Sequence, residues 1–276
     1  MLNDIFNYSD FVKKDYRNYH AYDLAKNLDI PTCVYCNRMY TKTVIVEEEA
    51  TEEEDIEEDS NKKTKNKKLT RPQFDHWFPK SKYPLLQLSF YNLIPSCSIC
   101  NSGLKGATEL NLQEHFHPYV KPTDDFKYAY SYDYKKDLNH FEFKIKTEND
   151  KARNTSNAFQ LKDIYDTHVD ELQDLLRIKE AYSESYIHML STMTSLNLDK
   201  EEIYRLAFGV HYEDALHDRR PLSKMKKDIL IELGIMPAEN EKEKQCTSTD
   251  NLDKNYQTIE KEETIAEAIE ADAAQD

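Results

Sequence analysis

The chain has 276 residues, of which 39% are hydrophobic and 32% charged, and its formal net charge is -15 at pH 7. This length and apolar content suffice for one large domain or two small ones with a buried core. No apolar run reaches the roughly 20 residues of a membrane helix, and MLNDIFNYSDF lacks the basic-then-apolar order of a signal peptide, so we expect a cytoplasmic protein.

The negative charge is concentrated in two segments. Residues 47–59 hold ten acidic residues and no basic one, and residues 237–276 hold twelve acidic residues against four lysines. Without these segments the remainder carries a small net positive charge, which would bind nucleic acid weakly. If this chain acts on nucleic acid, we therefore expect a partner that delivers it.

The N-terminal part of the chain predicts helices, then a strand. Residues 1–30 have apolar side chains at helical spacing, which Pro31 ends, and we expect them to pack against the region after Pro31. Residues 39–46 are rich in β-branched side chains and predict a strand. The opposed charge blocks of residues 47–68 cannot bury a core and are predicted to be a disordered insertion.

Four of the five cysteines form two CxxC pairs, Cys33/Cys36 and Cys97/Cys100. Each pair places two thiolates one turn apart, which is the spacing of a tetrahedral zinc corner. The alternative is four buried cysteines of a reduced cytosolic protein. Because four cysteine ligands leave no open coordination position, we expect a structural zinc ion and not a catalytic one.

The candidate chemistry lies between the two pairs. The apolar residue before Asp75 and His76 indicates a short strand, and Asn101 follows Cys100 near the start of an expected helix. Oxygens of Asp75 and Asn101 suit one magnesium ion, which favours hard ligands. The imidazole of His76 titrates near neutral pH and suits the removal of a proton from water.

The combination of CxxC, DHxxPKS, NL, CxxCN and KG resembles the HNH endonucleases, the zinc-stabilised branch of the ββα-metal (His-Me finger) nucleases, over about a quarter of the chain. This resemblance implies that His76 is the general base and that Asp75 and Asn101 bind Mg²⁺, for which Mn²⁺ can substitute. It also implies that Asn92 braces the loop that orients His76, and that the four cysteines bind zinc. Asn101 replaces the second histidine of the family name, a variant that also occurs in the HNH domain of RNA-guided CRISPR nucleases.

Several nearby basic residues are candidate substrate contacts. Lys80, Lys82 and Lys105 would position phosphates near the metal or simply be exposed. In NLQEHFHPYV, His115 and His117 would contact a substrate phosphate or support the catalytic metal site, or else have a structural role.

The C-terminal half has different patterns. Residues 126–134 and 140–146 alternate aromatic and polar side chains and predict a hairpin, whose aromatics would form a base-stacking platform or the inward face of a sheet. From residue 157, helical spacing over about thirty residues predicts one long helix or two stacked ones, followed by helices at 201–208 and 222–233.

These patterns predict an α+β protein in four regions. They are a helical segment (1–30), a zinc-bound HNH module (31–120), a hairpin and helical region for partner or substrate (121–236), and a disordered acidic tail (237–276). The layout resembles the HNH subunit of Septu-type anti-phage systems (PtuB-like), which implies an ABC/AAA-like ATPase partner and phage defence.

The expected activity is metal-dependent hydrolysis of DNA phosphodiester bonds. Since one HNH site cuts one strand, cleavage of both strands would need two copies of the chain, in an oligomer, or two encounters. Two alternatives stay open. One is a non-catalytic zinc module that binds nucleic acid or a partner, and the other is a stand-alone restriction-type nuclease.

Overall fold

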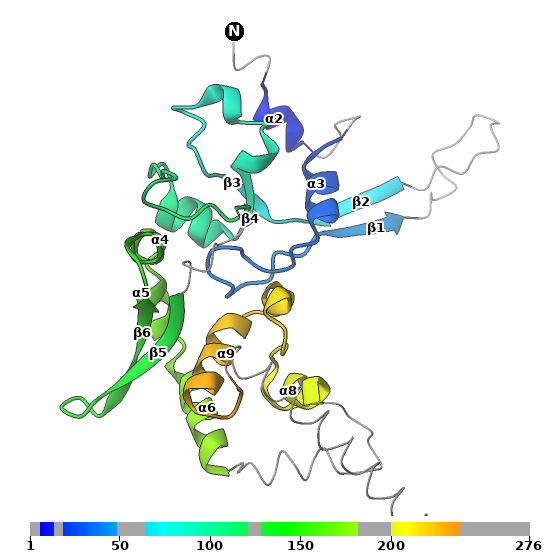
Figure 1. The fold of residues 1–276 in the computed structure, drawn as a ribbon. Coiled ribbons are helices and arrows are strands. Elements are labelled where there is room, and N and C mark those ends of the chain that lie inside the picture. The colour runs from blue at the N-terminus through cyan, green and yellow to red at the C-terminus, as the bar shows by residue number, and fades with distance from the viewer. Residues whose placement is uncertain (1–5, 14–18, 49–64, 121–127, 182–199, 238–276) are drawn as a thin grey trace, which may run out of the picture. The chain divides into compact units, whose positions relative to one another are not determined.

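The computed structural model of the protein describes residues 6–13, 19–48, 65–120, 128–181 and 200–237 (Figure 1). Residues 1–232 form one compact unit, which therefore joins the expected N-terminal, zinc-bound and hairpin–helical regions, and residues 233–276 form a second unit. The predicted acidic tail lies outside the described residues except for Pro237. Among the described helices, none has the length and apolar character to cross a membrane. The α+β class expected from the sequence is confirmed.

The central hairpin consists of β3 (Gln73–His76) and β4 (Leu93–Ser96), which pair antiparallel with Asp75 opposite Ile94 and His76 opposite Leu93. The short strand predicted around Asp75 and His76 is thus confirmed. Two 3-10 helices, η1 (Pro84–Leu86) and η2 (Phe90–Asn92), lie in the loop between these strands.

The helix expected near Cys100 is η3 (Ile99–Lys105), which is a π-helix. It ends at Gly106, whose φ of 51° is a conformation that glycine adopts without steric strain. The chain therefore runs from strand to loop to strand to helix, with Asp75 and His76 on the first strand, β3, and Asn101 in the helix, η3.

The N-terminal helices α2 (Tyr8–Phe11) and α3 (Ala21–Leu28) confirm the helical prediction for the described part of residues 1–30. A capping box begins α3, because the His20 side chain accepts from the Asp23 backbone while the Asp23 carboxylate accepts from the His20 backbone. Its apolar side buries Ala21 and Leu24 against residues of the central hairpin, including Phe74 and Leu93.

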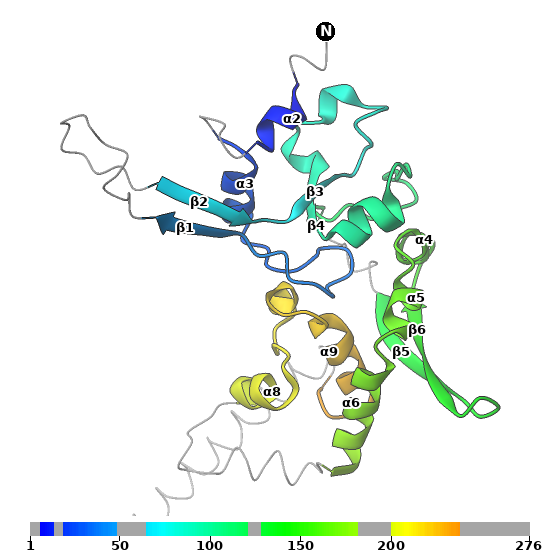
Figure 2. The ribbon, with the colours of Figure 1, turned by 180° about the vertical axis from the view of Figure 1, so that it is seen from behind.

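The ribbon of β1 (Val44–Glu48) and β2 (Lys65–Thr70) corrects the predicted boundaries of the charged insertion. The two strands pair antiparallel, and Glu48 is the backbone partner of Lys65 (Figure 2). Residues 47–48 and 65–68 therefore belong to strands, because backbone pairing satisfies N–H and C=O groups whatever the side chains are. The rest of the insertion, residues 49–64, lies outside the described residues.

The C-terminal half begins with the predicted hairpin, which is confirmed as β5 (Tyr128–Lys135) and β6 (His140–Thr147). Tyr130 and Phe143 are buried, which agrees with the interpretation of these aromatics as the inward face of a sheet. The hairpin packs against α9 (Ser223–Glu232) on β5 and α5 (Leu161–Asp166) on β6, as Figure 1 shows.

After residue 157, where one long helix or two stacked ones were expected, the described residues form two helices, α5 and α6 (Val169–Ala181), and α4 (Asp150–Ala158) precedes them. The rest of the predicted helical stretch, residues 182–199, lies outside the described residues. Helix α4 was not predicted, and Asn149 caps it by accepting a hydrogen bond from the Ala152 N–H. Gln160 adopts a left-handed conformation with φ of 45°, which separates α4 from α5. The last helices, α8 (Lys200–Phe208) and α9, confirm their predictions, and η4 (Asp214–Arg219) lies between them.

Candidate active site and metal centre

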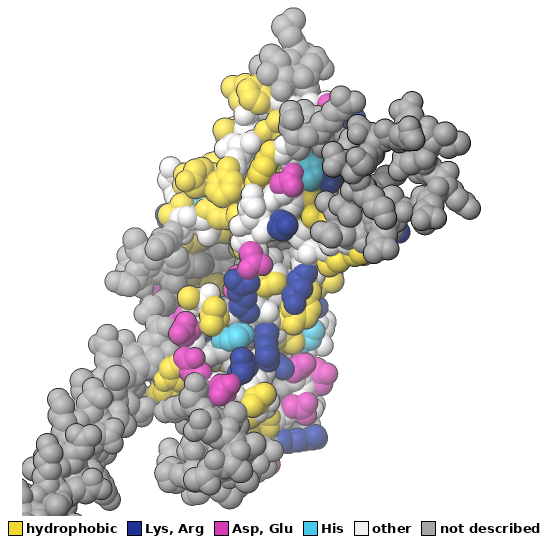
Figure 3. All heavy atoms as spheres, turned by 90° about the vertical axis from the view of Figure 1, so that its right-hand side faces the viewer, with side chains coloured by type: hydrophobic (Ala, Val, Ile, Leu, Met, Phe, Trp, Pro, Cys, Tyr) yellow, Lys and Arg dark blue, Asp and Glu magenta, His cyan; other side chains and the backbone are white. Residues whose placement is uncertain are grey.

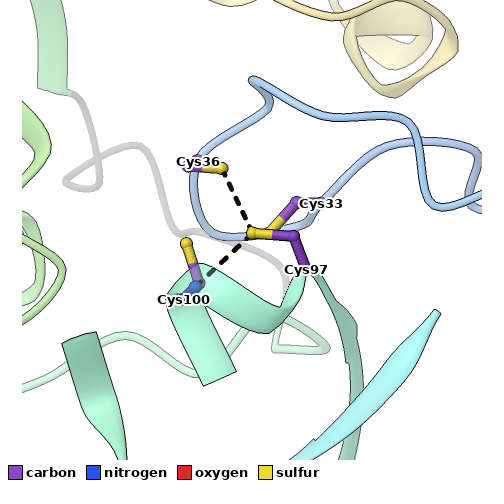
Figure 4. Close-up of side chains that lie close together, drawn as sticks. All are labelled: Cys33, Cys36, Cys97 and Cys100. Carbon is purple, nitrogen blue, oxygen red and sulfur yellow. Dashed lines mark hydrogen bonds between the residues drawn. The ribbon is translucent and has the colours of Figure 1, made fainter. Parts of the chain in front are cut away.

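The four cysteines of the CxxC pairs converge in one buried cluster (Figure 4). Their Sγ atoms all lie within 4.8 Å of one another, and those of Cys36 and Cys97 are 4.0 Å apart. Zinc–sulfur bonds of about 2.3 Å in a tetrahedron would place the sulfurs about 3.8 Å apart, so the cluster fits zinc after a small contraction. The four thiols thus form a site that can hold a metal ion such as zinc.

The loop that carries Cys33 and Cys36 is tied to the C-terminal half of the chain. The hydroxyl of Tyr165 donates to the Cys36 carbonyl oxygen at 2.6 Å, and the Leu222 N–H donates to the Asn37 carbonyl oxygen at 2.6 Å. The side chain of Asn37 also donates to the carbonyl oxygens of His217 and Arg220. These bonds, which involve residues far apart in the sequence, fix the position of the first cysteine pair.

Asp75 is buried on β3, and each of its carboxylate oxygens accepts a hydrogen bond. The Tyr35 hydroxyl donates to Oδ2 at 2.6 Å, and the Lys105 ammonium donates to Oδ1 at 3.1 Å. Burial raises the pKa of Asp75 above its usual range, although the charge of Lys105 and both hydrogen bonds oppose that effect. The carboxylate is therefore held in place by one donor on each side.

His76 is also buried, and its Nε2 atom lies 3.0 Å from the Gln87 carbonyl oxygen. Because a carbonyl oxygen only accepts, the proton of neutral His76 is assigned to Nε2, which leaves the Nδ1 lone pair available. Burial, with smaller effects of the Lys80 and Lys105 charges, lowers the pKa of His76 to about 4, although the bond to Gln87 opposes this shift. The imidazole is thus neutral at pH 7, which is the form a general base needs.

The side chain of Asn92 ties together the loop between β3 and β4. Its Oδ1 atom accepts from the Phe78 N–H at 2.7 Å, and its Nδ2 atom donates to the carbonyl oxygens of Phe78 and Leu86. Leu86 directly precedes Gln87, whose carbonyl oxygen contacts His76. The buried Asn92 therefore lies where it can fix the loop that orients this imidazole.

Asp75, His76 and Asn101 line one cleft of about 410 Å³. Asn101 reaches it from η3, where its Nδ2 atom donates to the Gln73 Oε1 atom at 2.9 Å. A carboxylate has about four lone-pair positions, so Asp75 keeps acceptor capacity beyond its two bonds, and the Asn101 amide oxygen is a second hard ligand. Oxygens of these two kinds are the ligands that magnesium favours, although the ammonium of Lys105 next to Asp75 would weaken binding of a cation.

The candidate substrate contacts have different environments. Lys80 is exposed, lines the cleft and lies with its Nζ atom 5.0 Å from the centre of the Tyr8 ring. Lys82 is exposed and forms an ion pair with Glu109 at 2.5 Å. The prediction for Lys105 is corrected, because its side chain is 0% exposed and its ammonium is committed to Asp75 and to the His76 carbonyl oxygen.

Neither of the two candidate histidines lies among the residues that line the cleft. His117 is buried with its ring 4.8 Å from that of Trp77, and its Nδ1 atom accepts from the Tyr119 N–H, which agrees with a structural role. His115 accepts a long hydrogen bond from the Asn111 N–H at 3.4 Å. Both histidines therefore lie outside the candidate site.

Several of the residues that line or support the candidate site were not predicted from the sequence. Tyr8 and Arg71 line the cleft, and the Tyr8 ring contacts His76 edge-on with 4.5 Å between ring centres. Tyr35 carried a signal, since it lies inside the first CxxC pair, next to expected zinc ligands. Gln87 carried none, because it acts through a backbone atom that every residue has.

Comparison with known proteins adds no further assignment. No family model, no curated protein and no solved structure matches the chain. The chemistry of the site itself therefore carries the functional argument.

Proposed function

We propose that the protein is a metal-dependent HNH-type endonuclease that hydrolyses phosphodiester bonds of DNA. The observation that carries this proposal is the meeting of Asp75, His76 and Asn101 in one cleft. The ββα order of β3, β4 and η3 and the cysteine cluster beside them support it. A scaffold would need only the four cysteines, whereas a hydrolase needs a base and oxygen ligands together.

In the proposed mechanism, the Nδ1 atom of His76 takes a proton from the attacking water while Nε2 keeps its bond to the Gln87 carbonyl oxygen. A magnesium ion held by Asp75 and Asn101 would supply stabilisation of the charge that develops on the phosphate oxygens. Lys80 and Arg71 add positive charge to the cleft and would attract the phosphodiester.

We further propose that the chain acts with a partner that brings the DNA, as the effector of an anti-phage complex with an ATPase. The net charge of -15 opposes unaided binding to DNA. On the face shown in Figure 3, lysine and arginine side chains of the described residues have acidic side chains beside them. The ATPase and the defence role rest on the Septu-like layout of the sequence.

A second candidate function is a non-catalytic zinc module that binds a partner or nucleic acid. The observation that favours it is the occupation of both Asp75 oxygens by Tyr35 and Lys105, as in a purely structural ion pair. The two candidates differ in what they require of His76, because a zinc scaffold has no use for a neutral imidazole in a cleft.

The test is cleavage of supercoiled plasmid by the zinc-loaded chain, with Mg²⁺ or with a chelator that removes Mg²⁺ but leaves the zinc content unchanged. We expect Mg²⁺-dependent nicking that His76→Ala lowers about 100-fold or more, since general bases contribute on that scale. His140→Ala, on the β5–β6 hairpin, is the matched control and should nick like the wild type. If the zinc-loaded wild type does not cleave DNA, alone or with the proteins that co-purify with it, the binding module becomes the better explanation. Single-stranded RNA in the same assay checks the choice of nucleic acid.

A further inference from the structure

Tyr35 connects the cysteine cluster to the candidate active site. It lies between Cys33 and Cys36 in the sequence, and its hydroxyl donates to the Oδ2 atom of Asp75 at 2.6 Å. Its ring is buried and stacks on Phe159, with 3.9 Å between ring centres and an angle of 19° between the planes. The tyrosine therefore has a fixed position, set on one side by the loop of residues 33–37, here called the knuckle, and on the other by Phe159, which caps the C-terminus of α4.

The other carboxylate oxygen of Asp75 accepts a hydrogen bond from Lys105, which lies on the same helix as Cys100 of the second cysteine pair. Lys105 ends η3, the helix that contains Cys100, and its buried ammonium donates to Oδ1 of Asp75 at 3.1 Å and to the His76 carbonyl oxygen at 2.8 Å. The segments that carry the two CxxC pairs thus each supply one hydrogen-bond donor to the carboxylate of Asp75. The two donors restrain the rotation of a side chain that also lines the cleft.

We infer that Tyr35 is a positioning residue, which transmits the geometry of the cysteine cluster to Asp75 and so sets the affinity of the cleft for a divalent cation. This inference rests on the proposed function, in which Asp75 is a cation ligand. Donors that contact a metal-binding side chain from behind orient it, and their loss typically lowers metal affinity about 10-fold to 100-fold. Without the Tyr35 hydroxyl, the pull of Lys105 on the carboxylate would be unopposed.

The chain offers a matched control for this hydroxyl. Tyr165 is also a buried tyrosine, and its hydroxyl donates at 2.6 Å to the Cys36 carbonyl oxygen in the same knuckle. It does not contact Asp75 through any hydrogen bond among the described residues. Tyr35→Phe and Tyr165→Phe thus each remove one hydroxyl next to the cluster, but only the first removes a donor to the carboxylate.

The experiment measures binding of Mn²⁺, as a probe for Mg²⁺, to the zinc-loaded full chain by the electron paramagnetic resonance signal of free Mn²⁺. Zinc content and thermal midpoint are recorded for every variant. We expect Tyr35→Phe to keep its zinc, to bind Mn²⁺ about 10-fold more weakly than the wild type and to need correspondingly more Mg²⁺ for half-maximal cleavage. Tyr165→Phe should bind Mn²⁺ like the wild type, and Asp75→Asn should not bind it in the cleft.

Three results would overturn the inference, and they differ in whether the proposed function survives. If wild type and Tyr35→Phe bind Mn²⁺ equally while Asp75→Asn does not bind it, Tyr35 is only structural and the proposed nuclease site survives. If Tyr35→Phe and Tyr165→Phe weaken binding equally, the effect comes from the knuckle as a whole and not from the bond to Asp75. A wild type that binds no Mn²⁺ in the cleft removes the proposed function together with this inference.

Discussion

The Nε2 atom of His76 lies 3.0 Å from the carbonyl oxygen of Gln87, so the orientation of the imidazole depends on the backbone of a loop. A substitution of Gln87 itself would leave that carbonyl in place. The loop is instead tied through Asn92, which donates to the carbonyl oxygen of the preceding residue, Leu86. A substitution of Asn92 is therefore expected to displace the Gln87 carbonyl oxygen, which contacts His76.

We expect Asn92→Ala to lower the free energy of unfolding by about 3 kcal/mol, because it leaves three backbone groups of a buried loop without their partner. Denaturation in urea measures this change. Asn154→Ala removes a single long bond of 3.3 Å, to the Glu114 carbonyl oxygen, and should have a much smaller effect. Equal unfolding midpoints for the two variants would show that Asn92 does not brace the loop.

The buried ion pair of Lys105 and Asp75 predicts strong coupling between the two side chains. Lys105→Met would leave a buried carboxylate without its cation and should cost about 3 kcal/mol of stability, whereas adding Asp75→Asn should recover part of that loss. A double-mutant cycle in urea measures the coupling. Lys82→Met breaks the exposed pair with Glu109 and serves as the control, for which we expect no measurable change. Strict additivity of Lys105→Met and Asp75→Asn would contradict this account.

His117 predicts a loss of stability on acidification. Burial lowers the pKa of His117 below its usual value, against the effect of a hydrogen bond with the Tyr91 backbone. The unfolded chain therefore binds the proton more readily, so this contribution to stability is complete above a pH of about 6.5 and declines as the pH falls from there towards the pKa of the folded state.

We expect the thermal midpoint of the wild type to fall between pH 7 and pH 5, and His117→Phe to fall less steeply over the same range. Burial also lowers the pKa of His76, His168 and His211, whose contributions remain in the variant and give it a residual slope. The comparison concerns slopes, so a constant change in stability caused by the substitution does not affect it. If the thermal midpoints of the wild type and His117→Phe fall in parallel with pH, His117 does not contribute to the loss of stability in acid.

The cysteine cluster predicts one zinc ion for each chain. Removal of zinc with a strong chelator, or Cys97→Ser, should abolish cooperative unfolding, because the metal holds together elements that are far apart in the sequence. Elemental analysis measures the zinc content, and circular dichroism measures the unfolding transition. Cys246→Ser changes a cysteine outside the CxxC pairs and should leave the zinc content and the unfolding transition unchanged. A zinc-free chain that unfolds like the untreated protein would instead support four ordinary buried thiols.

Local patterns predicted the parts of the fold that depend on neighbouring residues. The alternation in residues 126–134 and 140–146 predicted the hairpin, and the CxxC spacing predicted the cysteine cluster. The break at Gln160 was missed, because glutamine has no preference for the left-handed conformation that the packing of α4 and α5 imposes.

The candidate site was predictable to a different extent. Asp75, His76 and Asn101 were recognised as one set from their motif, and they line one cleft. The burial of Lys105 was not predictable, because its partner is 30 positions away and a lysine is usually exposed. The contact of Tyr8 with His76 was not predictable for the same reason, because Tyr8 belongs to α2, which is far from His76 in the sequence.

The side chain of Asn37, in the knuckle that carries the first cysteine pair, bonds to carbonyl oxygens 180 and 183 positions later in the chain. A ribosome adds about 5–20 residues each second, so these partners are synthesised on the order of 10 s or more after the knuckle. During that interval the knuckle lacks the contacts that fix it in the finished protein. Folding of the metal centre is thus tied to the end of translation of this region, and fragments that stop before residue 217 are expected to be poor zinc binders and prone to degradation.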